Sequence, residues 1–438
     1  MPQSVDSSAN SHGSGDRTRP AGALVLNTES LLRATLWLML ALSCLSFIEP
    51  SPYEFFFFAL IPVALLNGLV FTRTTLTLFF LLFTTICAQL VSLAPYLDKP
   101  AVGVQTMSSS LYTAYSVYLH ASGVLFAMIF SQRTSDRLGL ALRAYALSCV
   151  FAGAWGLLSW LNVAGIGDRE PIIGRIAGPF KDPNVLGTYC IMGVLYLMHG
   201  AIVGQRHRVL CFVGMSIALM GGVFLSFSRG SWAAMLFGAT LLVALMYATA
   251  RDARVRVRIR RGLVALGLLA ALGGAIAVSN GTLRDTIADR AQVTHSYDEG
   301  ETGRFGNQLR SIPMLIERPL GFGPFRFPLQ FGLQPHNSYI GAFTDGGWVG
   351  GCAFLLLVLA TARFALRQAV RRSPYRAHAQ IVACALLALF LQAFQIDIDH
   401  WRFLFLMIGA VWGIESALRR DARRAPLEAG GPSPKPAG

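Results

Sequence analysis

The sequence has few charged residues. Asp, Glu, Lys and Arg together make up 14% of its 438 residues, whereas hydrophobic residues make up 54%, and the mean hydropathy is +0.51. So low a charge content excludes an ordinary soluble domain, because the surface of such a domain needs many polar side chains. We therefore expect lipid to be the main solvent of this chain.

The sequence also lacks the motifs of several enzyme classes. It has no Walker-type phosphate loop, no dinucleotide-binding fingerprint and no serine nucleophile elbow, so an ATP-driven mechanism finds no support. Its seven cysteines lie within apolar stretches and lack metal-ligand spacing. We expect them to be packing residues, and we expect neither a disulfide nor a metal site.

Long apolar segments are the main feature that is present. A helix that crosses a bilayer needs roughly 17 to 25 such residues. Segments of this kind predict an all-α polytopic membrane protein with about twelve transmembrane helices. They lie near residues 31–48, 54–72, 75–94, 108–131, 138–164, 184–204, 209–226, 231–249, 262–279, 337–361, 379–396 and 401–417.

The two ends of the chain differ in composition from the rest. Residues 1–27 are rich in Ser, Gly, Asp and Arg, and residues 425–438 are rich in Pro, Gly and Ala. Such compositions cannot bury enough apolar surface to fold alone, so we predict two disordered cytoplasmic tails. The transmembrane domain is then residues 28–424.

The basic residues predict an orientation. With both termini in the cytoplasm, 25 of the 37 Lys and Arg residues fall in the tails and cytoplasmic connections and 12 in the outer ones. This split satisfies the positive-inside rule for a bacterial inner-membrane protein. The clusters RDARVRVRIRR (251–261) and RQAVRRSPYR (367–376) become cytoplasmic anchors beside lipid headgroups. The net charge of +14 then needs no nucleic-acid partner.

Two outer connections, residues 165–183 and 280–336, are long enough to hold a site. In the second, a periplasmic loop in this orientation, an apolar helix face is predicted by the spacing of Phe305, Leu309, Ile312 and Ile316. We expect this helix to lie flat on the outer leaflet. Pro313 and the run ERPLGFGPFRFP are expected to break or kink it, and the chain returns to the membrane at Pro335.

Several cations on the outer side depart from the positive-inside rule. Arg229 lies in SFSRGSW, and the others lie in the two long connections, namely Arg175, Lys181, Arg304, Arg310, Arg318 and Arg326. Because the planar guanidinium suits bidentate contact with phosphate, these residues predict a pyrophosphate site. The alternative for each is an ion pair with a loop acid or contact with a lipid headgroup.

Three histidines lie on the outer side, of which His295 in THSYDEGE is expected to be solvated. His336 precedes Asn337 in QPHNSYIGA, where the long connection re-enters the membrane, and an ordinary imidazole pKa near 6.5 suits a general base. His400 lies in DIDHWR with Asp397 and Asp399. For His400, a structural hydrogen-bond network is favoured as strongly as a catalytic role.

With these residues identified, the sequence resembles the O-antigen ligase and polymerase superfamily of bacterial membrane glycosyltransferases. The resemblance spans roughly residues 170 to 350. It depends on the order of GRIAGPFKDPNVLGTY, FLSFSRGSWAAM and ETGRFGNQLRSIPMLIERPLGFGPFRF, the last of which leads to PHNSYI.

The resemblance implies a helical fold of the class C glycosyltransferase type. It also implies transfer of a whole glycan from undecaprenyl diphosphate at the periplasmic face, with membrane lipids around the enzyme. Arg175, Arg229 and Arg304 are then the diphosphate ligands, and His336 takes the proton from the acceptor hydroxyl. Supporting roles fall to Lys181, Arg310, Asn337 and His400. Arginines at the leaving group would replace a divalent cation, so no cofactor is expected.

The leading interpretation is an O-antigen ligase whose acceptor is lipid A-core. A polymerase of the same superfamily, with a second lipid-linked glycan as acceptor, shares the same motifs. A protein O-oligosaccharyltransferase is less favoured, because the chain ends soon after its last span. Outside this superfamily, a transporter or lipid flippase is favoured mainly by Asp345 within the tenth predicted span.

Overall fold

The structure is a computed structural model that describes residues 27–429 except 49, 104–105, 171–173, 205–206, 265–299 and 301–302. The elements of the described residues are helices, which confirms the predicted all-α class. Residues 253–264 are also helical. The named helices are α1 (Thr28–Ala41), α2 (Pro52–Leu66), α3 (Arg73–Leu93), α4 (Ser109–Ser131), α5 (Thr134–Trp160), α6 (Pro183–Val203), α7 (Arg208–Ile217), α8 (Arg229–Thr249), α11 (Arg304–Glu317), α12 (Phe327–Phe331), α13 (Ser338–Val370), α14 (Arg376–Gln392) and α15 (Arg402–Ala429).

Eleven of the predicted spans each overlap a helix, and the other, 262–279, lies almost wholly outside the described residues. Six described helices are long and apolar enough to cross a membrane, namely α3, α4, α5, α6, α8 and α13. The count of twelve and the orientation therefore stay predictions. The predicted tails, residues 1–27 and 425–438, lie largely outside the described residues and also stay predictions.

The distribution of polar residues is that of a protein in lipid. Apolar side chains point outward from the long helices, as at Phe80 on α3, which is 60% exposed, and Leu359 on α13, which is 64% exposed. In contrast, Glu415 on α15 is fully buried and pairs with Arg367 and Arg419. Ionisable groups inside a membrane protein are expected to pair within the helix bundle in this way.

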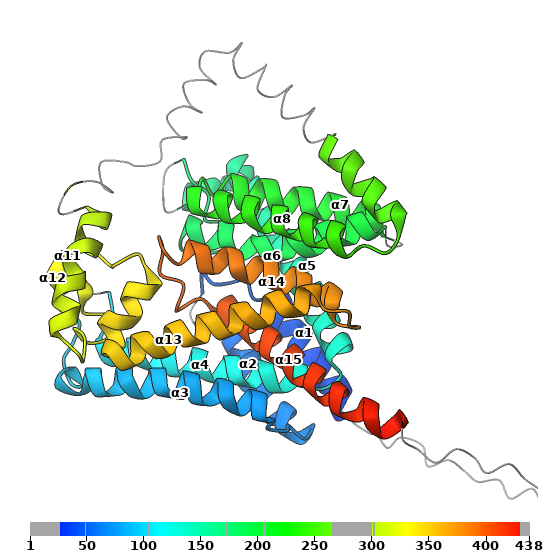
Figure 1. Ribbon diagram of the computed structural model, residues 1–438. Helices are drawn as coiled ribbons and strands as arrows, with labels where there is room; N and C mark the ends of the chain where they lie inside the picture. Colours follow the sequence, from blue (N-terminus) through cyan, green and yellow to red (C-terminus); the bar gives the residue numbers. More distant parts are fainter. Residues whose placement is uncertain are drawn as a thin grey trace, which may run out of the picture.

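The helices form one bundle in which α13 and α14 run through the middle (Figure 1). α13 packs on α3, α15 packs on α4, and α14 packs on α8 and α6. α11 and α12 lie at one end of the bundle, beside the start of α13, whereas residues 253–264 and the end of α15 lie toward the opposite end (Figure 1). The described part of the long connection that was predicted to hold function, residues 303–336, therefore lies at a single end.

α13 contains a break near that end. Gly347 has φ 59° and ψ −159°, a backbone conformation that is essentially confined to glycine. Residues 319–323 fill the break. The N–H groups of Phe322 and Gly323 donate to the Thr344 carbonyl at 2.8 and 3.2 Å, and the Trp348 N–H donates to the Pro319 carbonyl at 2.9 Å. These bonds satisfy backbone groups that the break frees, as lipid requires.

α11 has its polarity reversed relative to a helix of a soluble protein. The predicted apolar face is confirmed and points outward, with Leu309 69% and Ile316 64% exposed, while Asn307, Gln308 and Ser311 are buried. Whether this face lies on the outer leaflet stays a prediction.

α11 continues through Pro313 and ends at Glu317, the first residue of the run ERPLGFGPFRFP that was expected to break or kink it. The next residue, Arg318, precedes Pro319 and leaves the helical conformation with a ψ of 83°. A residue that precedes proline favours such a conformation.

We predict that Gly347→Ala destabilises the folded chain. A Cβ at this position would lie 2.1 Å from the Pro319 carbonyl oxygen, and the backbone conformation itself costs about 1–3 kcal/mol for a residue other than glycine. We expect the thermal midpoint in detergent, followed by fluorescence-detected size exclusion, to fall by about 5 °C or more. Gly346→Ala is the matched control, since its Cβ would meet the Ala88 Cβ at an ordinary 3.6 Å. Equal midpoints for the two variants would contradict the account of the break.

Candidate functional site

A cavity of about 290 Å³ lies at the end of the bundle that carries α11. Arg175, Arg229, Arg304 and His336 all line it, although they come from four separate segments of the chain. We call it the arginine cavity. Its other polar lining residues are Asp182, Asn184, Ser228, Gln392, Gln395 and Asp397. The structure thus brings together the three arginines and the histidine that the sequence singled out.

Arg175 is held by two segments that meet beside it. The Ile176 N–H donates to the Leu225 carbonyl at 3.0 Å. The Nε of Arg175 donates to the Ser226 carbonyl at 3.0 Å, and its Nη2 donates to Asn184 Oδ1 at 2.9 Å. Arg175 therefore joins the connection before α6 to the turn before α8 while lining the cavity.

Three helices begin at the arginine cavity. Arg229 is the first residue of α8 and Arg304 the first residue of α11. α6 starts after Asp182, whose carboxylate caps it by accepting the Asn184 N–H at 2.6 Å. The first N–H groups of a helix lack intrahelical partners and carry a partial positive charge, so they favour an anion. The N-termini of α8 and α11 therefore add to the charge of the arginines, whereas at α6 the Asp182 carboxylate already occupies this position.

The backbone at the start of α8 lies close to two glutamine side chains. A Cβ on Gly230 would lie 3.2 Å from the side-chain nitrogens of both Gln392 and Gln395. Glycine here lets these two amides come close to the first turn of α8. Both glutamines line the arginine cavity.

His336 lies in a strained turn that neighbouring side chains hold. Its φ of 47° is in the left-handed region, which is uncommon for residues other than glycine but several-fold enriched in histidine. The Nε2 of Gln308 on α11 donates to the Pro335 carbonyl at 2.9 Å. On the other side, the Asn337 N–H donates to Asp397 Oδ1 at 3.0 Å. Both ends of the turn are therefore fixed.

Asp397 also faces the imidazole itself. Its Oδ2 lies 3.5 Å from His336 Nδ1, and the histidine side chain is 37% exposed. Burial raises the pKa of Asp397 to about 7, and the nearby Asp399 carboxylate adds to the shift. A carboxylate beside Nδ1 favours the tautomer in which Nε2 can accept a proton. The pair therefore has the geometry of a general base and the group that orients it.

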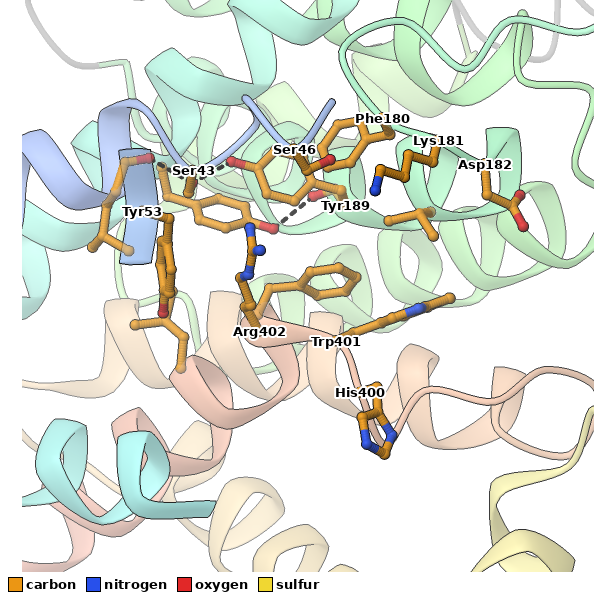
Figure 2. A pocket seen from close by; sticks show the side chains of 15 residues that line it. Ser43, Ser46, Tyr53, Phe180, Lys181, Asp182, Tyr189, His400, Trp401 and Arg402 are labelled. Atoms are coloured by element: carbon orange, nitrogen blue, oxygen red, sulfur yellow. Dashed lines mark hydrogen bonds between the residues drawn. The ribbon is translucent and has the colours of Figure 1, made fainter. Parts of the chain in front are cut away.

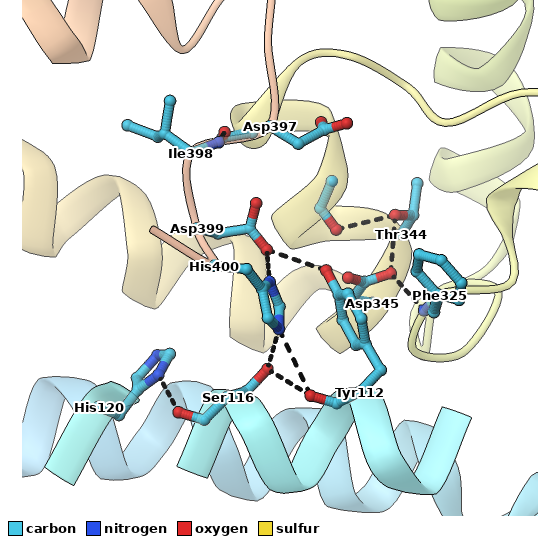
Figure 3. Close-up of polar contacts among 12 residues, drawn as sticks. Tyr112, Ser116, His120, Phe325, Thr344, Asp345, Asp397, Ile398, Asp399 and His400 are labelled. Carbon is cyan, nitrogen blue, oxygen red and sulfur yellow. Dashed lines mark hydrogen bonds and ion pairs between the residues drawn. The ribbon is translucent and has the colours of Figure 1, made fainter. Parts of the chain in front are cut away.

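A second polar cluster surrounds His400 (Figure 3). His400 Nδ1 lies 2.7 Å from Asp399 Oδ2, which also accepts from the Tyr112 hydroxyl at 2.9 Å, and His400 Nε2 lies 3.1 Å from Ser116 Oγ. Burial opposes charge on both members, but their mutual attraction outweighs it, so the pKa of Asp399 is lowered and the pKa of His400 is raised. These contacts are those of the structural network considered for His400.

The remaining predicted residues lie outside the arginine cavity. Lys181 lines a neighbouring cavity of about 260 Å³, which we call the tyrosine cavity after Tyr53, Tyr145 and Tyr189 (Figure 2). Arg310 donates to Asn307 and lies over the Phe331 ring, 5.7 Å from its centre. Asn337 caps α13 by accepting the N–H groups of residues 339 and 340. No group of metal-ligand residues occurs within the described part of the chain.

Sequence reasoning missed two residues that position the histidine. Asp397 was noted only as a neighbour of His400, and its pairing with a residue 61 positions away leaves no local pattern. Gln308 could have been found, since it follows Arg304 by four residues and therefore lies on the same face of α11. That face was passed over because the apolar face gives the stronger periodicity.

Comparison with known proteins identifies one family. The O-antigen ligase family model matches residues 214–355, a range that contains Arg229, Arg304 and His336 but not Arg175. No curated protein matches the chain. A chain from the structure described as "Structural coordination of polymerization and crosslinking by a peptidoglycan synthase complex" has 17% sequence identity and a TM-score of 0.39. The match covers 79% of this chain and 97% of that one, and no conclusion is drawn from it.

Proposed function

Because residues 214–355 place the chain in the O-antigen ligase superfamily, we propose that it transfers a glycan from undecaprenyl diphosphate to lipid A-core at the periplasmic face of the inner membrane. The observation that carries the proposal is the meeting of three arginines and a histidine in one cavity. The alternative acceptor is a second lipid-linked glycan, which would make the chain a polymerase.

The arginine cavity suits a diphosphate leaving group. The guanidinium groups of Arg175, Arg229 and Arg304 can each donate more than one hydrogen bond to phosphate oxygens. The N-termini of α8 and α11 add preorganised N–H donors. Such donors stabilise negative charge as it develops on the departing diphosphate, without reorganising during the reaction.

His336 would supply the other half of the chemistry. The acceptor hydroxyl oxygen forms a bond to the anomeric carbon of the donor glycan while the bond between that carbon and the diphosphate oxygen breaks. The hydroxyl proton moves to His336 Nε2, and the electron pair of the broken bond leaves with the diphosphate. Asp397 beside Nδ1 stabilises the imidazolium that forms. A single displacement of this kind inverts the anomeric configuration.

The tyrosine cavity supports a lipid-linked donor. It shares Asp182, Val185 and Trp401 with the arginine cavity, and much of its wall is apolar, with Leu40, Phe180, Phe403 and Leu406. Lys181 and Arg402 reach into it from different segments (Figure 2). We propose that the polyprenyl chain next to the diphosphate extends along this wall and that Lys181 contacts the phosphate nearer the lipid.

A transporter remains the rival from another class. The break in α13 is the observation that favours it, because transporters place broken helices around their substrates. However, the backbone groups at this break bond to residues 319–323 instead of lining an ion site. The glycosyltransferase proposal accounts for the arginines, which a transporter does not require.

Deletion of the gene tests the proposed function, with the surface polysaccharide then separated on a gel. Accumulated lipid-linked polymer together with bare lipid A-core is expected for a ligase. Loss of long chains with single repeat units still joined to lipid A-core would identify a polymerase instead. An unchanged polysaccharide profile in the deletion strain would contradict both.

We predict that Arg229→Ala abolishes or severely reduces glycan transfer while the protein stays folded in the membrane. The change removes charge-assisted contacts to the diphosphate worth roughly 1.5–3 kcal/mol, which corresponds to about 10- to 150-fold in rate. Arg229→Lys should restore only part of the activity, since lysine keeps the charge but loses the planar fork. Transfer is measured with purified protein in vesicles.

Arg310→Ala is the matched control for Arg229→Ala. It removes a guanidinium from the same end of the bundle, but this one lies against Phe331 and does not line the arginine cavity. We expect near-normal transfer. Full activity in Arg229→Ala, or an equal loss in both variants, would remove the diphosphate assignment.

For His336 we predict that substitution by Asn lowers turnover by roughly a hundredfold to ten-thousandfold, the usual contribution of acid–base catalysis. Asparagine is chosen because it tolerates the left-handed backbone that His336 adopts, so the turn is preserved while the imidazole is lost. The KM for the donor should change little, because the arginines remain. Steady-state kinetics in vesicles give both values. A His336→Asn protein that transfers at near-normal rates would exclude His336 as the base.

A further inference from the structure

A third cavity lies on the far side of Asp397 from the arginines. Its volume is about 520 Å³, within the range of about 300–1,000 Å³ that small-molecule sites occupy. Aromatic side chains and carboxylates dominate its lining, so we call it the acidic cavity. These residues are Tyr112, Tyr115, Tyr118, Phe325, Asp345, Asp397 and Asp399.

The acidic cavity and the arginine cavity share a wall. Asp397 lines both of them, and the turn that carries the proposed base lies between them, since Pro335 lines the acidic cavity and His336 lines the arginine cavity. A displacement at a single carbon needs the attacking group and the leaving group on opposite sides of that carbon. If the diphosphate occupies the arginine cavity, the attacking hydroxyl must arrive from a space such as this one.

The two cavities differ in charge. Asp345 is only 6% exposed, and its Oδ1 accepts the Phe325 N–H and the Thr344 hydroxyl, both at 3.2 Å (Figure 3). The charge of Asp399 is offset by His400, and Arg402, which also lines this cavity, pairs with Glu54 at 2.5 Å. The acidic cavity thus offers phosphate little positive charge, whereas the arginine cavity with its three arginines favours phosphate.

The lining suits a sugar that carries no phosphate. Carboxylate oxygens accept hydrogen bonds from sugar hydroxyl groups. The rings of Tyr115, which is 38% exposed, and Phe325 offer apolar surface to the C–H faces of the same sugar. Phe325 has a left-handed φ of 58° and follows directly on the segment 319–323 that fills the break of α13.

We infer that the acidic cavity binds the acceptor sugar, the residue whose hydroxyl attacks the donor, through Asp345 and the aromatic wall. This inference rests on the proposed function and adds the acceptor's place and class to it. The bound sugar is unphosphorylated, its hydroxyl groups donate to Asp345, and its attacking hydroxyl lies near Asp397, where the two cavities meet beside His336. The arginine cavity holds the cations that the diphosphate needs, so donor and acceptor do not compete for one site.

The test is steady-state transfer by the purified full chain in phospholipid vesicles, with undecaprenyl-diphosphate-linked glycan as donor and lipid A-core as acceptor probe. Asp345→Asn is expected to raise the acceptor KM about tenfold or more, with the donor KM unchanged within about twofold. Tyr115→Ala should also raise the acceptor KM. Because the Tyr115 side chain is partly exposed, this variant is expected to fold, and it tests the inference even if Asp345→Asn does not fold.

Asp168→Asn is the matched control. Its carboxylate lies in another connection, where it accepts from Asn162 at 3.0 Å, and it should leave both KM values unchanged. A wild-type chain that transfers to neither lipid A-core nor a water-soluble repeat-unit oligosaccharide would overturn the proposed function itself. An active wild type combined with an unchanged acceptor KM in both variants, or with a raised donor KM instead, would overturn the acceptor site alone.

Discussion

The carboxylate of Asp397 fixes the turn that carries His336. It accepts the Asn337 N–H and faces the imidazole, and so ties the start of α13 to the connection between α14 and α15. Ser338 reinforces the junction, since its N–H donates to the Ala393 carbonyl and its hydroxyl accepts the Ile398 N–H. The same junction separates the arginine cavity from the acidic cavity. Two opposite electrostatic environments therefore meet at one short segment, where the proposed chemistry needs them to meet.

The second constraint is that backbone groups in lipid must find partners within the protein. It explains why the glycine-rich segment after α11 packs where it does, because residues 319–323 supply those partners at the break of α13. Glycine is needed at Gly321 as well, where a Cβ would lie 2.4 Å from the Thr344 carbonyl oxygen. This close packing also fixes Phe325 beside Asp345. The break in α13 thus shapes the wall of the acidic cavity without itself binding anything.

The sequence predicted the features that depend on local patterns. Apolar length located the helices, and the spacing of Phe305 and Leu309 located the outer face of α11. Arg229 and Arg304 were found because they are cations on the predicted outer side, opposite to the basic clusters. What failed or was missed depends on tertiary contacts. Of the two features expected to break or kink α11, the helix passes through Pro313 and ends at the run from Glu317, and the pairing of Asp397 with His336 joins residues too distant in sequence to form a motif.

The position of α11, and with it the geometry of the site, depends on the medium that the exposed apolar face of this helix meets. The helix presents Leu309 and Ile316 outward and its amides inward, and it carries Arg304 at one end and Gln308, which holds the histidine turn, one turn later. Water would not retain a helix in that orientation, whereas hydrocarbon would. On the predicted orientation, in which this apolar face meets the outer leaflet, the thickness and lateral pressure of that leaflet belong among the determinants of where the arginine and the imidazole lie.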